Sequence, residues 1–258
     1  MSNLHWTSAI TKVEPNKLSI RGYALDELIG RTGFGQMVYL LLKGEMPEEN
    51  TSKMIEAILV SSIDHGTTPP SVLSALTVAS TGAPLNASAA AGILSISAYH
   101  GGAIEDCMHI LQNAVEIKNN TKHGFEEAAK EIIQTYRSEK KRLAGFGHRL
   151  HTNDPRKNKL FSVAEENGLF GDFCRMANTI ASQLEKITGK QLPLNVDGAI
   201  AALLCEMDFD PVLANGFFMI ARMPGLIAHI YEEKTRQKPM RKIHPTDVSY
   251  DGPENKSL

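Results

Sequence analysis

The sequence is poor in cysteine and has no excess of charge of either sign. Its 258 residues include three cysteines, and its 27 basic and 29 acidic side chains give a formal net charge of -2. Cys107, Cys174 and Cys205 are far apart and lie among apolar residues, which favours buried, reduced thiols over disulfides or a Cys-x-x-Cys metal site. A nearly neutral chain lacks the basic field that holds nucleic acid or an anionic membrane. We therefore expect no nucleic-acid partner, and any anion must be bound locally.

Long apolar runs are also missing. The longest, around residues 200–204, is far shorter than the roughly 20 residues that cross a bilayer. The first residues have neither the basic nor the apolar segment of a signal peptide. These absences predict a cytoplasmic protein with no membrane association, of a length that suits one large or two modest domains.

Apolar residues recur with helical spacing along most of the chain. Helices are predicted over residues 34–43, 48–63, 70–79, 83–98, 104–117, 126–137, 159–167, 173–187, 195–207 and 210–223. Pro224 is expected to break or kink the chain, with a further helix to residue 238. No convincing series of strands is present, so the predicted fold class is all-α.

Residues 144–156 carry an unusual density of titratable and cationic groups. They include two glycines around an aromatic residue, two histidines, an Asp-Pro pair and two arginines. The glycines allow positive φ or a close approach to a ligand, and Asp154-Pro155 starts a helix. The segment predicts an anion-binding catalytic turn that presents His148, with Arg156 at a helix start. The alternative is a glycine-rich loop whose histidine binds a backbone carbonyl.

Four histidines lie beside a glycine or another helix breaker, namely His65, His100, His148 and His244. Imidazole exchanges protons near neutral pH, although each histidine alone has a structural explanation. Asp197 also has one, because an aspartate before glycine at a helix start is a common N-cap.

Three arginines, Arg156, Arg222 and Arg241, are placed near breaks in the helical pattern. Capping does not explain them, and the arginine fork is a preferred partner of carboxylates. Together with the histidines and Asp197, they predict a metal-free acid–base site for a polycarboxylate.

Six motifs follow one another in the order found in citrate synthases. They are Arg21-Gly22-Tyr23 with Leu28, residues 38–47, His100-Gly101-Gly102-Ala103, residues 145–156, Asn195-Val196-Asp197 and residues 221–229. The chain resembles this family over nearly its whole length and looks most similar to the short citryl-CoA lyases, which are related to the C-terminal lyase domain of ATP-citrate lyase. The resemblance implies a citrate-synthase-like fold with the active site between two helical domains. These are a reduced large dimerisation domain, residues 1–102 and 216–258, and a small CoA-side domain, residues 103–215.

The resemblance also implies roles for single residues. Asp197 would be the acid and base at the acetyl methyl carbon, and His100 would donate a hydrogen bond to the thioester oxygen. His148 would serve the hydroxyl or carbonyl oxygen of the four-carbon part. The residues implied to hold substrate carboxylates are His65, Arg156, Arg222 and, from the other subunit of a homodimer, Arg241 or His244.

The activity implied is that of a citryl-CoA lyase, which produces acetyl-CoA and oxaloacetate without a metal or a cofactor other than the CoA of its substrate. Two alternatives stay open. A minimal citrate synthase would run the same carbon–carbon step as a condensation, and an inactive module would only bind CoA or a polycarboxylate. The joint presence of Asp197, His100 and His148 argues against the inactive module.

Overall fold

A computed structural model of the chain describes residues 6–121, 124–147 and 154–241. Contacts between residues divide the chain into two units, the first being Met1–Asp64 with Ile96–Pro224 and the second His65–Ser95 with Gly225–Leu258. These units have other boundaries than the predicted large and small domains, and the assignment of those two domains stays a prediction. Helices make up most of both units, which confirms the predicted helical class.

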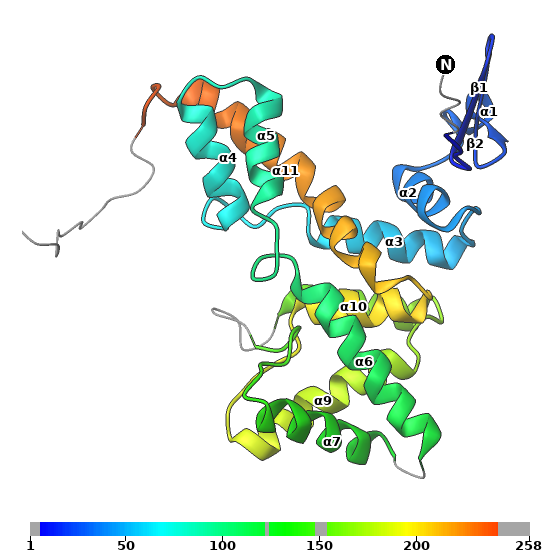
Figure 1. Cartoon of the computed structure of the whole chain (residues 1–258), viewed down its shortest axis with the longest axis vertical. Coiled ribbons are helices and arrows are strands. Elements are labelled where there is room, and N and C mark those ends of the chain that lie inside the picture. The colour runs from blue at the N-terminus through cyan, green and yellow to red at the C-terminus, as the bar shows by residue number, and fades with distance from the viewer. Residues whose placement is uncertain (1–5, 122–123, 148–153, 242–258) are drawn as a thin grey trace, which may run out of the picture. The chain divides into compact units, whose positions relative to one another are not determined.

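A small antiparallel sheet near the N-terminus was not predicted. Strands β1 (Thr11–Glu14), β2 (Lys17–Ile20) and β3 (Tyr23–Ala24) pair in the order β1-β2-β3 (Figure 1). Asn16 turns the chain between β1 and β2 with a φ of 59°, a conformation that asparagine tolerates better than most residues. Strands this short hold too few residues to show a period-two pattern. The expectation that strands are absent is therefore wrong for this segment.

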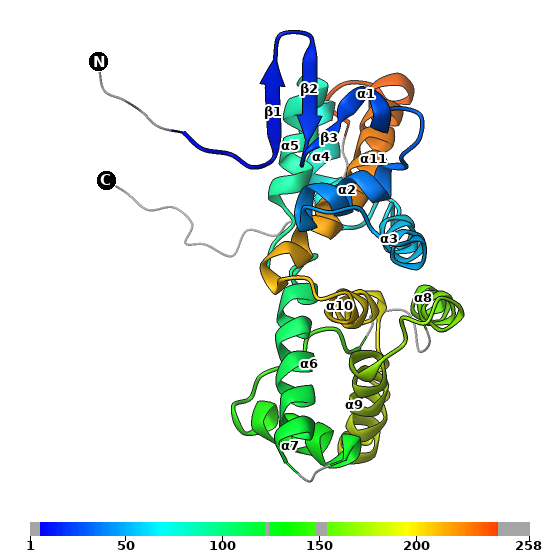
Figure 2. The ribbon, with the colours of Figure 1, turned by 90° about the vertical axis from the view of Figure 1, so that its right-hand side faces the viewer.

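The first unit is built around a helix that is buried on nearly every side. Its helices are α1 (Leu25–Leu28), α2 (Phe34–Lys43), α3 (Glu49–Ser61), α6 (Ala103–Asn120), α7 (Phe125–Ser138), α8 (Pro155–Glu166), α9 (Asp172–Thr188), α10 (Val196–Glu206), the 3₁₀ turn η1 (Pro211–Leu213) and the start of α11 (Ala214–Arg236). Helix α10 is apolar all round, as a central helix must be, and packs against α6, α8 and α9 (Figures 1 and 2). The start of this central helix bears Asp197.

The second unit consists of α4 (Pro70–Ser80), α5 (Leu85–Leu94) and the C-terminal part of α11 (Figures 1 and 2). Small residues bring these helices close together. A Cβ added at Gly92 would lie 2.9 Å from a methyl carbon of Leu226 and 3.0 Å from the carbonyl oxygen of Ser71. The predicted helix over residues 83–98 is shorter than expected, because the chain leaves the helix at Ser95.

Helix α11 continues past Pro224, so the predicted break at this residue is wrong, whereas a kink there stays a prediction. A proline inside a helix removes one backbone hydrogen bond, and it can kink the helix without ending it. Within the described part of the chain, Pro211–Arg236 is the one stretch long and apolar enough to cross a membrane, with a mean hydropathy of 1.3. A buried core helix has the same composition, and Phe217, Leu226 and Ile230 of this stretch are fully buried.

Candidate active site

Asp197 lies in the first turn of α10 but does not cap it. The N-cap is Asn195, whose side-chain oxygen accepts a hydrogen bond from the backbone N–H of Gly198 at 3.1 Å. The capping explanation of Asp197 is therefore wrong, since the residue two positions earlier does that work. Asp197 as a whole residue is half-buried.

The pKa of Asp197 is raised above its ordinary value. Burial is the main cause, and the negative charge of Asp154 adds to it, while the positive charges of Arg156 and Arg222 act in the opposite direction. These influences place Arg156 and Arg222 in the electrostatic neighbourhood of Asp197. A carboxyl whose pKa is raised can give and take a proton closer to neutral pH than an exposed aspartate can.

The glycine-rich segment predicted as a tight turn lies directly beside the start of α10. The backbone N–H of Gly147 donates to the carbonyl of Pro193 at 2.7 Å, and that of Asn195 donates to the carbonyl of Gly145 at 3.0 Å. The Asn195 side chain also donates to the carbonyl of Gly147 at 2.9 Å. These bonds confirm the predicted turn up to Gly147. His148, the catalytic candidate that follows, lies outside the described residues.

Two glycines permit this close contact. Gly145 has a φ of 83°, and a Cβ there would lie 2.6 Å from the sulfur of Cys107 and 2.8 Å from the Cα of Gly198. A Cβ at Gly198 would in turn lie 2.5 Å from the carbonyl oxygen of Gly145. The turn and the first turn of α10 therefore fit together only because both positions are glycine.

Arg156 lies in the first turn of α8 and is already paired. Its Nε donates to Oδ1 of Asp154 at 3.0 Å and its Nη2 to Oδ2 at 2.8 Å, while Asp154 is 1% exposed. This two-pronged pair uses one edge of the guanidinium and leaves the other edge unused by Asp154. The predicted role of Arg156 as a carboxylate ligand stays a prediction, and it would have to use that other edge.

Arg222 is a buried cation in α11 with one nitrogen unsatisfied. Its side chain is 2% exposed, its Nε donates to the carbonyl of Ser62 at 2.9 Å, and its guanidinium lies 4.7 Å from the ring centroid of Phe218. Burial lowers the pKa of Arg222, and the charges of Asp64 and Asp197 raise it in part. Its Nη1 is buried and has no hydrogen-bond partner among the described residues. A buried charged donor left in this state is costly, and an anionic ligand would satisfy it.

His100 stands on a tight loop between Ile96 and α6. Its backbone N–H donates to the carbonyl of Ser97 at 2.8 Å, and the N–H of Ser97 donates back at 2.9 Å. The imidazole meets the ring of Phe218 edge to face, with centroids 5.7 Å apart. Phe218 thus contacts both His100 and Arg222. The one sign of this role in the sequence is its position four residues before Arg222.

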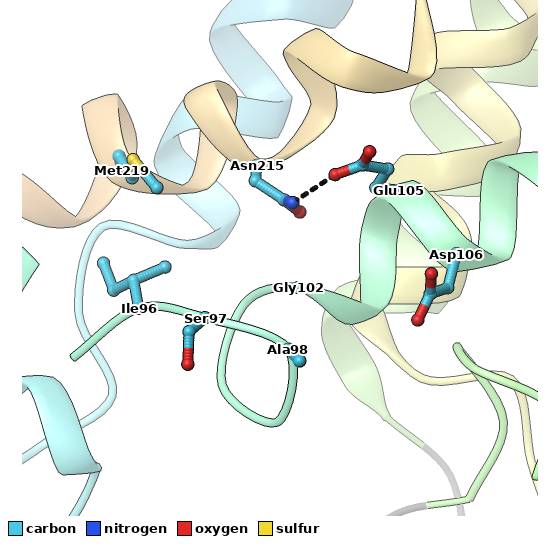
Figure 3. Close-up of a pocket in the computed structure, with 8 residues that line it drawn as sticks. All are labelled: Ile96, Ser97, Ala98, Gly102, Glu105, Asp106, Asn215 and Met219. Carbon is cyan, nitrogen blue, oxygen red and sulfur yellow. Dashed lines mark hydrogen bonds between the residues drawn. The ribbon is translucent and has the colours of Figure 1, made fainter. Parts of the chain in front are cut away.

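A cavity of about 260 Å³ lies beside this loop (Figure 3). It is lined by Ile96, Ser97, Ala98, Gly102, Glu105, Asp106, Asn215 and Met219. The amide of Asn215 donates to Glu105 at 2.6 Å, and its Oδ1 is buried without a partner among the described residues. Sequence reasoning missed Glu105 and Asn215. The available signal for Glu105 was the acidic pair that follows one residue after the motif that contains His100.

The remaining predicted ligands belong to the second unit or fall outside the description. His65 and Arg241 are residues of the second unit. Arg241 is paired within its own chain, because its Nε and Nη2 donate to the buried carboxylate of Glu233 at 3.0 and 2.5 Å. His244 lies outside the described residues. The binding roles of these three residues stay predictions.

Within the described residues, no group of three or more histidine, cysteine, aspartate or glutamate side chains is arranged to hold a metal ion. The three cysteines are buried and free, as predicted from their spacing. Among the described residues, the positive groups that act on Asp197 are Arg156 and Arg222.

Residues 47–246 match the protein family described as citrate synthase, C-terminal domain. Among curated proteins, ATP-citrate synthase beta chain protein 2 of Arabidopsis thaliana is 30% identical over 239 residues, covering 84% of this chain and 37% of that protein. The chain thus spans little more than a third of the length of this relative.

Among solved structures, citryl-CoA lyase from Hydrogenobacter thermophilus is similar with a TM-score of 0.89 and 44% sequence identity, covering 98% of this chain and 97% of that one. ATP citrate lyase of Methanosaeta concilii, in complex with (3S)-citryl-CoA, is similar with a TM-score of 0.84 at 23% identity, covering 98% of this chain and 42% of that one. The second likeness shows a shared fold.

Proposed function

Because the chain belongs to the citrate synthase family, we propose that it is a citryl-CoA lyase, which cleaves citryl-CoA to acetyl-CoA and oxaloacetate. The observation that carries this proposal is the 44% identity to a citryl-CoA lyase over nearly the full length of both chains. The location is proposed to be cytoplasmic, on the composition of the sequence.

In the proposed cleavage, a base removes the proton of the tertiary hydroxyl, and the carbon–carbon bond breaks as that oxygen becomes the ketone of oxaloacetate. The bonding electrons pass to the acetyl part, which becomes a thioester enolate. His100 is proposed to donate a hydrogen bond to the enolate oxygen, where charge develops. Protonated Asp197 then gives its proton to the enolate carbon and forms acetyl-CoA. His148 is proposed as the base at the hydroxyl.

Two features of the first unit support this assignment. Asp197 has a raised pKa, which favours the protonated form that the last step needs. Arg222, whose charge acts on Asp197, has a buried nitrogen with no hydrogen-bond partner among the described residues, and a substrate carboxylate is the kind of ligand that would satisfy it. The same arrangement suits a minimal citrate synthase, since condensation is the reverse of this step.

An assay in both directions separates the lyase from the synthase. Purified protein is incubated with citryl-CoA, and separately with acetyl-CoA and oxaloacetate, while oxaloacetate and free CoA are followed. We expect oxaloacetate from citryl-CoA with little release of free CoA. Release of CoA from acetyl-CoA and oxaloacetate at a comparable rate would favour the synthase, and no reaction in either mixture would favour a binding module.

We expect activity that does not depend on added metal, because the histidines and cysteines lack the spacing of a metal-ligand set and the developing charge is proposed to be stabilised by histidine and arginine side chains. Dialysis against EDTA, followed by assay with and without Mg²⁺ or Zn²⁺, checks this. Unchanged rates are expected. A loss that one of these ions restores would contradict the prediction and reveal a ligand set among residues outside the description.

A homodimer is proposed as the functional assembly. The second unit exposes large apolar side chains, with Leu94 82% and Tyr231 70% exposed and Leu85 and Ile227 also accessible. An apolar surface of this kind is typical of a permanent interface, which buries roughly 2,000 Å² or more. The proposal includes a carboxylate ligand, Arg241 or His244, that reaches the site of the partner.

Mixed dimers test whether sites are shared. Subunits with Asp197→Asn are combined with subunits that carry Arg241→Ala and His244→Ala, each inactive alone. Under random exchange about a quarter of the parental sites should recover, because half of the dimers are mixed and each has one intact site. Glu233→Gln is the matched control, since it breaks the pair with Arg241 but leaves both proposed ligands in place. No recovery from verified mixed dimers would contradict site sharing.

A further inference from the structure

One buried carboxylate links two helices at the candidate site. Oδ1 of Asp154 accepts the backbone N–H of Arg156 at 3.0 Å and so caps α8. Oδ2 of the same carboxylate accepts the backbone N–H of Val196, the first residue of α10, at 3.2 Å. The start of α10 therefore has two caps, its own Asn195 and Asp154 from a distant part of the sequence.

The same two oxygens also hold the side chain of Arg156, at 3.0 and 2.8 Å. Asp154 is 1% exposed, and a carboxylate so deeply buried persists only when it is paired and hydrogen-bonded. Burial alone would raise the pKa of Asp154, but its hydrogen bonds to Arg156 and Val196 and the charge of Arg156 outweigh burial and lower it. Asp154 is therefore ionised at neutral pH.

Four described groups face Asp197 with a charge or a titratable proton. Arg156 and Arg222 are positive, Asp154 is negative, and Cys107 is a buried thiol of α6 that stays neutral because burial raises its pKa. Burial is the main reason for the raised pKa of Asp197, and Asp154 is the charged group that acts in the same direction.

We propose that Asp154 is a positioning residue of the reaction, because its one carboxylate fixes both the fork of Arg156 and the first turn of α10 that bears Asp197. This inference rests on the proposed function. In this proposal Asp154 acts through the location of Arg156 and through the proton affinity of Asp197, and not through a contact with the substrate.

The chain offers a matched control for this proposal. Asp210 is also an aspartate before a proline, and its side chain caps η1 by accepting the N–H of Val212 at 3.0 Å. Asp154→Asn and Asp210→Asn therefore make the same chemical change at two Asp-Pro caps. Only the first cap contacts Arg156 and α10.

With citryl-CoA, Asp154→Asn should lower kcat by roughly 10²-fold, the effect of a displacement of about 1 Å in a catalytic group. The high-pH limb of kcat should move to lower pH. The pKa of Asp197 should fall when the negative charge of Asp154 is removed, and the protonated form needed for the reaction is then lost at a lower pH. Asp210→Asn should leave both unchanged. A parental rate and pH limb in Asp154→Asn would overturn the proposal, whereas an inactive parent would overturn the proposed function instead.

A second measurement needs no substrate. The free energy of unfolding of Asp197→Asn, relative to that of the parent, should increase as the pH rises from the ordinary aspartate pKa to the raised pKa of folded Asp197. In an Asp154→Asn background this increase should be smaller, and an equal increase in both backgrounds would overturn the proposal. If Asp154→Asn does not fold, Asp154→Glu tests the positioning role instead. Glutamate keeps the negative charge but places the carboxylate one methylene further from the backbone. A lower kcat with an unmoved pH limb is expected, and a parental kcat would contradict a positioning role.

Discussion

Asp197→Asn is expected to reduce cleavage of citryl-CoA by about 10²–10⁴-fold, the usual contribution of a general acid or base. The amide has nearly the size of the carboxyl but cannot deliver a proton to the enolate carbon. Asn195 caps α10 in its place, so the substitution should leave the helix intact. Single-turnover rates and the binding of citryl-CoA measure the two effects separately, and affinity should change little.

The same variant should be more stable than the parent near neutral pH. In the parent, the folded pKa of Asp197 is raised, so the folded state holds the proton more tightly than the unfolded state does. Stability is then lost as the pH rises from the ordinary aspartate pKa through the raised one, and asparagine avoids this loss. Denaturant unfolding of both proteins across this pH range measures the difference in their free energies of unfolding.

Asp208→Asn is the matched control for Asp197→Asn. Asp208 is exposed and has a φ of 54°, a conformation that asparagine also accepts. The Asp208→Asn substitution should therefore change neither the activity nor the pH dependence of stability. Asp197→Asn with activity within a few-fold of the parent, or with a purely destabilising effect, would contradict the catalytic assignment.

Arg222→Met is expected to raise the KM for citryl-CoA at least tenfold. Removing one partner of a buried, hydrogen-bonded charge pair costs about 2–5 kcal/mol, and roughly 1.4 kcal/mol corresponds to a factor of ten. The physical reason is Nη1 of Arg222, which is buried with no hydrogen-bond partner among the described residues and is proposed to bind a substrate carboxylate. Inhibition by free CoA, which lacks the citryl carboxylates, should not change.

Arg222→Lys separates charge from shape. Lysine keeps the positive charge but loses the planar fork and its contact with Phe218, so the KM should lie between those of the parent and Arg222→Met. Equal KM values for all three proteins, at parental stability, would show that Arg222 binds no substrate carboxylate and that its buried position serves packing alone.

The helices could be predicted because their signal is local. Phe34–Lys43 has the predicted bounds, and Pro70–Ser80 differs by one residue, since the apolar period and the flanking glycine or proline lie within the segment itself. The N-terminal sheet could not be predicted, because strands of two to four residues carry almost no period. The continuation of α11 past Pro224 was left open, because a proline inside a helical pattern predicts either a break or a kink and the local sequence does not distinguish them.

The sequence by itself determined the helical class, the family motifs and the residue types able to exchange protons or hold carboxylates. These depend on patterns within a few residues and on the order of motifs. Only the tertiary structure decided which of those residues are buried, paired or hydrogen-bonded. It assigned the cap of α10 to Asn195, paired Arg156 with Asp154, and showed a nitrogen of Arg222 with no hydrogen-bond partner in the described part of the chain. Burial and ion pairing join residues far apart in the chain, and no local pattern records their distance or the water excluded between them.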